Sequence, residues 1–202
     1  MTIISITALP GKKAKKSRVC LQGGTDLTLY NKEVFRLGLK EGEELSEEVY
    51  EDILKNILIP RAKKRAMHLL EKQDRTEANL RQKLKESGYP QVAIETAISY
   101  VASYHYIDDE RYARNYVRYH QEGKSRKKIY EALRLKGVSK DLISLALEEE
   151  FEADEAGMII ELLEKKHYDV ETADIKEKSK MFRFLIGRGF APGDIDRILS
   201  KR

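Results

Sequence analysis

The first thirty residues show the alternation of hydrophobic and polar positions that is typical of β-strands. Ile4, Ile6 and Ala8 alternate with polar residues, as in a strand with one buried face. Residues 18–22 and 26–30 flank the sequence Gly-Gly-Thr at positions 23–25, which is a hairpin signal. The pattern predicts a small sheet of three strands over residues 2–30. A basic loop is expected at its edge, formed by Lys12, Lys13, Lys15, Lys16 and Arg18.

After residue 30 the hydrophobic spacing becomes helical. Asn31 can cap a short helix that ends near Gly38. Ser46 opens a second helix, because it is a favourable N-cap residue and acidic residues follow it in the first turn. Pro60 is expected to end this second helix and to occupy the first turn of the next one.

From residue 61 onward the chain repeats a module of about fifty residues. Each copy contains an apolar pair at i and i+4, a glycine four residues later, and then another apolar residue. The copies begin at Leu80, Ile129 and Met181, at offsets of 49 and 52 residues, and their glycines are Gly88, Gly137 and Gly189. The glycine predicts a left-handed helix C-cap, and the apolar residue after it can pack back on the helix.

One more helix precedes each repeated pair, at about residues 61–72, 108–121 and 153–167, and another follows each glycine, beginning at Pro90, Ser139 and Pro192. The sequence therefore predicts a mainly α fold with three tandem three-helix modules after a small N-terminal sheet. The expected boundaries are 1–60 for the sheet and helical lead-in, and 61–107, 108–150 and 151–202 for the modules.

Composition narrows the class of protein. Charged residues make up 36% of the chain, and a slender helical array offers the surface to carry them. The single cysteine, Cys20, excludes an internal disulfide and favours a reducing compartment. No apolar run has the length of a signal peptide or membrane span, so we expect a cytoplasmic monomer without membrane contact.

The candidate catalytic and metal motifs are weak. The sequence Gly-Lys-Ser at 123–125 resembles the end of a phosphate-binding loop, but Arg118 stands where that loop needs its first glycine. The histidines lack metal-ligand spacing. The acidic residues 108–110 could bind a hard cation, although a helix start explains them better. We expect no catalytic, metal or cofactor site and therefore no enzyme.

Charge is distributed unevenly and points to a partner. Residues 111–136 carry a net charge of +7, whereas residues 148–180 carry −7. Basic residues at a helix N-terminus oppose the helix dipole, so an external anion would explain them better than folding does. We call the candidate binding residues the basic stripe, and they are Arg111, Arg114, Arg118, Lys124, Arg126, Lys127, Lys128 and Arg134. An ordinary solvated face remains the alternative, and reversing Arg114 and Arg118 is expected to affect folding little.

Several of these segments together resemble the RecX family of regulatory proteins. The match is most specific at residues 107–113, Ile-Asp-Asp-Glu-Arg-Tyr-Ala, followed by Lys124-Ser125 and by Leu133 and Gly137. Residues 74–89 and 35–45 extend the resemblance toward the N-terminus. It implies a non-enzymatic protein that binds the RecA filament on single-stranded DNA and modulates the recombinase, generally as an inhibitor. Its partners would be the RecA filament and single-stranded DNA, contacted directly or through the filament.

Two other readings stay open, a DNA-binding module and a protein-interaction scaffold unrelated to RecA. Helix-turn-helix recognition needs basic and polar residues on the third helix of a module. In the second module that helix carries a net charge of −3, with Lys140 against Asp141, Glu148, Glu149 and Glu150. This distribution favours contact with a DNA backbone or a protein over reading of the major groove.

Overall fold

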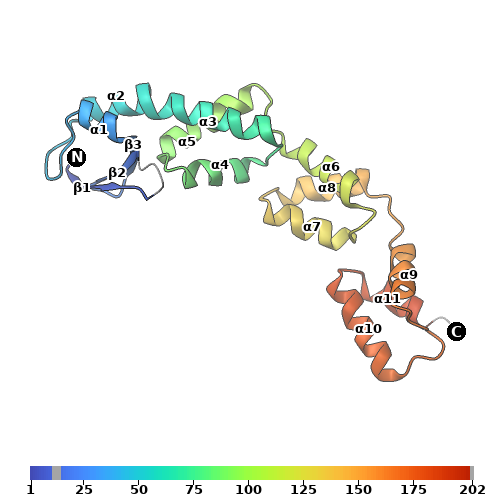
Figure 1. Ribbon diagram of the computed structural model, residues 1–202. Helices are drawn as coiled ribbons and strands as arrows, with labels where there is room; N and C mark the ends of the chain where they lie inside the picture. The colour runs from blue at the N-terminus through green and yellow to red at the C-terminus, as the bar shows by residue number, and fades with distance from the viewer. Residues whose placement is uncertain (11–14, 201–202) are drawn as a thin grey trace. The chain divides into compact units, whose positions relative to one another are not determined.

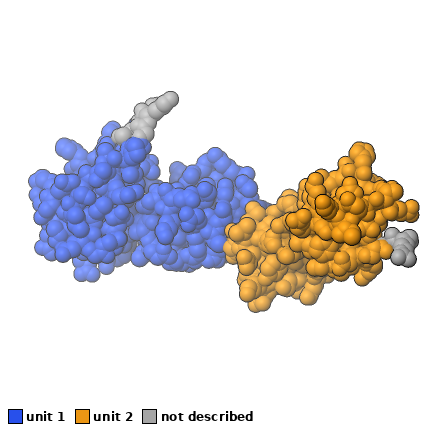
Figure 2. Space-filling model, turned by 90° about the horizontal axis from the view of Figure 1, so that it is seen from below, with its two compact units in different colours: residues 1–108 blue, residues 109–202 orange. Residues whose placement is uncertain are grey.

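The computed structural model describes residues 1–10 and 15–200, and it forms two compact units, residues 1–108 and 109–202 (Figures 1 and 2). The fold is mainly helical, with a small N-terminal sheet and three three-helix modules, as the sequence predicts. Lys12 and Lys13 of the expected basic loop lie outside the described residues, and Lys16 and Arg18 belong to a strand. None of the helices formed by the described residues combines the length and apolar character needed to cross a membrane.

The N-terminal sheet has the three antiparallel strands that the sequence predicts. They are β1 (Ile3–Ala8), β2 (Lys16–Leu21) and β3 (Asp26–Tyr30), in the order β1-β2-β3. The predicted buried face of β1 was wrong for Ile4 and Ala8, which are exposed, whereas Ile6 packs against the core and Ile3 is buried. The register shifts between Ile3 and Ser5, so Ile4 has no partner opposite it, and such an irregularity redirects the side chains around it.

A short helix, α1 (Asn31–Arg36), follows β3 directly. Its N-cap is Tyr30, not Asn31, and the Tyr30 backbone N–H donates to the Glu33 carboxylate over 2.7 Å. The Asn31 side chain instead accepts a hydrogen bond from the Ser17 hydroxyl at 3.1 Å, so it ties the helix to the sheet. Gly38 follows the helix with φ of 64°, as the predicted C-terminus requires.

The next helical segments run on without a break through Pro60. They are α2 (Glu47–Asp52), capped by Ser46 as expected, a π-helical turn η1 (Ile53–Leu58), and α3 (Ile59–Lys72). The prediction that Pro60 ends a helix was wrong. In the π turn the Ile59 N–H donates to the Leu54 carbonyl, five residues back, and this wider turn accommodates a proline that has no N–H and needs space for its ring.

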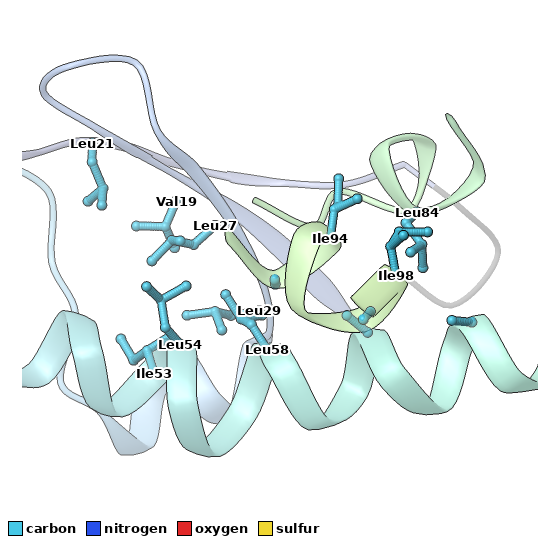
Figure 3. Packing of buried hydrophobic residues seen from close by; sticks show 14 of the residues in the cluster. Val19, Leu21, Leu27, Leu29, Ile53, Leu54, Leu58, Leu84, Ile94 and Ile98 are labelled. Carbon is cyan, nitrogen blue, oxygen red and sulfur yellow. The ribbon is translucent and has the colours of Figure 1, made fainter. Parts of the chain in front are cut away.

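One hydrophobic core fills unit 1, and the long helical segment forms its floor (Figure 3). Val19, Leu27 and Leu29 of the sheet lie over Ile53, Leu54 and Leu58. Further along the same segment lie Leu84 of α4 (Glu77–Glu86) and Ile94 and Ile98 of α5 (Gln91–Ser103). The sheet and the first module therefore share a continuous core.

Unit 2 contains the second and third modules. The second consists of α6 (Asp109–His120), α7 (Arg126–Leu135) and α8 (Lys140–Glu150), and the third of α9 (Glu155–Lys165), α10 (Ile175–Gly187) and α11 (Pro192–Leu199). Each module has its own cluster of buried residues, residues 113–147 and 159–199 respectively. In the second module α6 packs mainly against α8, which places α8 opposite the α6 arginines.

The repeated helix C-caps are confirmed. Gly88, Gly137 and Gly189 have φ values of 81°, 85° and 92°. In each copy the residue after the glycine donates its backbone N–H to a leucine carbonyl over 3.2 or 3.3 Å, which is the Schellman pattern. These leucines are fully buried, and they are Leu84, Leu133 and Leu185.

Candidate nucleic-acid and protein interface

The α6 arginines of the basic stripe are held by acidic residues. The Arg114 guanidinium lies 2.7 Å from the Glu110 carboxylate and 2.8 Å from that of Glu149. Arg118 donates through Nε and Nη2 to Glu150, with an Nη2 to Oε1 distance of 2.6 Å. This hydrogen bonding raises the pKa of Arg118 and lowers the pKa of Glu150. Much of the α6 charge is therefore compensated inside the module.

These ion pairs change what a charge reversal would do. A glutamate at position 114 or 118 would stand beside Glu149 or Glu150, so we now expect the reversal to cost some stability, where the sequence alone led us to expect almost none. The same contacts account for the acidic end of α8, which the sequence left without an explanation. Arg111, in the first turn of α6, is exposed.

The turn at residues 123–125 connects α6 to α7 and contacts the third module. Ser125 is buried, and its hydroxyl accepts from the Lys128 N–H at 3.3 Å while donating to the Arg188 carbonyl at 2.8 Å. The Lys124 ammonium donates to the Tyr116 hydroxyl at 3.1 Å. The residues that resemble a phosphate-binding loop therefore cap α7 and dock it against the end of α10.

Helix α7 carries several cations of the basic stripe, and three of them, Arg126, Lys127 and Arg134, are exposed. Lys128 pairs with Glu131 at 2.9 Å, and its hydrogen bond is the main cause of the lowered pKa of Glu131, to which Lys127 and Arg134 contribute. Lys127 and Arg134 are exposed and form no ion pair within the described part of the chain. We call Lys127, Lys128, Glu131 and Arg134 the α7 surface. Arg126 differs, because its guanidinium lies 5.8 Å from the Phe151 ring centroid and its backbone N–H bonds Glu155.

A second basic region lies in unit 1, and the sequence analysis missed it. Helix α3 carries Arg61, Lys63, Lys64, Arg65 and Lys72, against the single acid Glu71. The signal was available in the sequence as three consecutive bases at 63–65, but the excess of charge after residue 111 obscured it.

Two of the four histidines occupy strained helix ends. His105, after α5, and His167, after α9, have φ of 56° and 51°, in the left-handed region. The residues after them, Tyr106 and Tyr168, donate to Val101 and Leu163 at 3.1 and 3.0 Å, as at the glycine caps. These histidines therefore end helices. Within the described residues, no three His, Cys, Asp or Glu side chains cluster as a metal site would require.

The architecture and surfaces define a helical-repeat protein built from tandem three-helix modules. Three family profiles match these modules: RecX, first three-helix domain, at residues 62–100; the second domain at 108–147; and the third at 153–199. The chain therefore belongs to the RecX family of regulatory proteins, as the resemblance in its sequence indicates.

Relatives and solved structures agree with this assignment. The chain is 31% identical over 191 residues to "Regulatory protein RecX" of Caldanaerobacter subterraneus subsp. tengcongensis, which covers 94% of both proteins. It is 29% identical over 205 residues to that of Clostridium acetobutylicum, covering 98% of this chain and 95% of the relative. A crystal structure of regulatory protein RecX aligns with a TM-score of 0.63 at 25% identity, over 99% of each chain.

Proposed function

We propose that this protein binds the RecA filament on single-stranded DNA and inhibits the recombinase without catalysing a reaction. The observation that carries this proposal is the match of all three modules to the RecX family, whose members here are named regulatory proteins. Inhibition would follow from occupancy of the filament. This role requires the protein to work where RecA and DNA are found, in the cytoplasm.

We assign the filament contact to the α7 surface. Lys127 and Arg134 are exposed, and three cations surround one acid on this surface. An anionic partner would therefore be attracted more strongly to the α7 surface than to the α6 arginines, which are already paired with acids. Arg114 and Arg118 instead form ion pairs with acids of α8. The acids of α8 also disfavour the alternative of major-groove recognition, because a recognition helix must meet a polyanion.

The test is RecA ATPase activity on single-stranded DNA, measured as a function of the concentration of this protein. We expect the parent protein to lower the rate. Reversing Lys127 and Arg134 together to Glu should raise the concentration for half-inhibition on the order of tenfold, because two accessible cations become anions. The matched control reverses Lys176 and Lys180, which are exposed on α10. It should inhibit like the parent.

Different outcomes would contradict different parts of the proposal. If the parent protein leaves both ATPase activity and strand exchange unchanged, the proposed function is wrong. If the parent inhibits and the two double variants inhibit equally well, the contact lies outside the α7 surface.

A further inference from the structure

A cavity in unit 1 combines positive charge with aromatic walls. Its volume is about 540 Å³, within the usual range of about 300–1,000 Å³ for ligand sites. The sheet contributes Lys16 and Tyr30, α3 contributes Arg61, Lys64 and Arg65, and the turn before α5 contributes Tyr89. We call it the sheet–helix pocket.

Three of the cations in this pocket lie on the same face of α3 because of their spacing along the helix. Arg61, Lys64 and Arg65 are at i, i+3 and i+4 of α3, so they lie on one face of that helix. Lys64 and Arg65 are exposed. Neither they nor Lys16 form an ion pair with any acid in the described residues, whereas Arg61 pairs with Glu33. The lining also includes one acid, Glu71, so four cations stand against one carboxylate there and the pocket keeps a surplus of positive charge.

Aromatic rings and hydrogen bonds position the pocket's cations. The Arg61 guanidinium lies 4.5 Å and the Lys16 ammonium 5.2 Å from the centroid of the Tyr30 ring. The Tyr89 hydroxyl donates to the Arg61 carbonyl at 3.3 Å, and burial raises the pKa of Tyr89, so this hydroxyl stays protonated. Tyr30 also caps α1, which fixes the strand end to the helix. These contacts hold Arg61 and Lys16 against the tyrosines of the pocket.

We propose that the sheet–helix pocket binds the phosphodiester backbone of single-stranded DNA directly, without RecA. Neighbouring cations next to aromatic side chains suit a nucleotide, which presents a phosphate and a planar base. A flexible strand can bend one nucleotide into a concave pocket, whereas a duplex keeps its backbone on a stiff rod. The inference rests on the proposed function only for the choice of single-stranded DNA as the ligand, and it concerns a surface separate from the α7 surface.

The experiment measures fluorescence anisotropy of a labelled oligodeoxythymidylate 20-mer with the full-length protein and no RecA. In the K64E/R65E double variant, affinity should fall on the order of tenfold. The slope of log K against log salt should also flatten by about 1.4, because a single strand contributes about 0.7 per phosphate contact. The control K32E/R36E makes the same change of charge on α1, at exposed positions outside the pocket lining. It should retain parental affinity and slope, and circular dichroism should show that both variants are folded.

Four results would overturn the proposal, three with the single strand and one with a duplex. The first is equal binding by the parent and K64E/R65E, and the second is an equal loss in both double variants, which would indicate only bulk charge. The third is competition by thymidine monophosphate as effective as that by the oligonucleotide, which would indicate a site for small phosphate esters. A duplex of equal length should bind more weakly than the single strand. If it binds as tightly, the inference of a single-strand site is wrong.

The failure of this inference can be distinguished from failure of the proposed function. DNA binding in this assay needs no RecA, and RecA ATPase inhibition is measured with the α7 variants. If K64E/R65E binds DNA like the parent while the parent still inhibits RecA, only the pocket assignment is wrong.

Discussion

Leu133 shows at the scale of one residue how the repeat specifies a core. It lies in α7 with 0% exposure, and its carbonyl receives the N–H of Val138 at the helix end. Truncating Leu133 to Ala should lower the free energy of unfolding by about 2–5 kcal/mol, since it removes buried methyl groups and leaves a cavity. Urea denaturation measures this change. Leu135→Ala, two residues away at 85% exposure, is the control and should be nearly neutral. A Leu133→Ala protein as stable as its control would contradict the assigned core.

His120 should make stability depend on pH. Burial, followed by the nearby Lys124 and Lys136, lowers the pKa of His120 below its ordinary value of 6.5. When pH falls below 6.5, the unfolded chain therefore takes up a proton at this position before the folded one does. Its contribution to stability is present above that pH and is lost as pH falls through the lowered folded value.

The measurement compares thermal unfolding of the parent and His120→Gln between pH 8 and pH 5. The parent should lose more stability over this range than the variant, and the difference should vanish above pH 7.5 or so. An NMR titration of the imidazole checks the cause directly. A His120 ring that titrates at or above 6.5 would contradict this prediction.

Local sequence patterns predicted residues whose environment is set within a few positions. The three glycines and their leucines are such residues, because a helix end fixes both the backbone conformation and the contact. Ile4 and Asn31 are different. Ile4 is exposed because the register of β1 against β2 shifts there, and Asn31 serves Ser17 on another strand. Neither the register shift nor the contact with Ser17 can be recognised from the spacing of residues along one segment.

At the scale of elements, we predict that charge pairing adds to the hydrophobic contact between α6 and α8. Arg118→Glu would place a carboxylate beside Glu150 and should lower the melting temperature. Adding Glu150→Arg restores an opposite-charge pair in the reversed order, and should recover much of the loss. Differential scanning fluorimetry at low and high salt measures both effects, which salt should weaken. If the swapped pair melts no higher than Arg118→Glu alone, the pairing does not stabilise this contact.

The same pair of helices shows why the candidate site was only partly predictable. Spacing placed Arg111, Arg114 and Arg118 on one face of α6, but it could not tell which helix that face would meet. The packing of α8 there brings acids of α8 beside two of these arginines, which form ion pairs with them although Arg118 stays exposed. The continuous helical segment from α2 through α3 could not be predicted either. A π-helical turn at residues 53–58 accommodates Pro60, which would otherwise be expected to interrupt the helix.

At the scale of the whole molecule, the arrangement of cores governs how the chain unfolds. In unit 2 the second and third modules bury separate clusters of hydrophobic residues, within residues 113–147 and 159–199. Hydrogen bonds between them in the described residues include Ser125 to Arg188 at 2.8 Å, Arg126 to Glu155 at 3.0 Å and Glu152 to Gln121 at 2.8 Å. Tandem modules with their own cores contribute nearly separate stabilities, in contrast to a domain with one core.

We therefore expect calorimetric unfolding to show more than one transition, with a calorimetric enthalpy larger than the van't Hoff enthalpy of any single one. Leu133→Ala should lower the temperature of the second-module transition, and Leu185→Ala, equally buried in the third module, should lower a different one. Because the two substitutions remove the same atoms, they serve as matched controls for each other. A single transition that both shift equally would mean that the contacts around Ser125 couple the modules into one cooperative unit. The third module would then have to be treated as part of any surface proposed on the second.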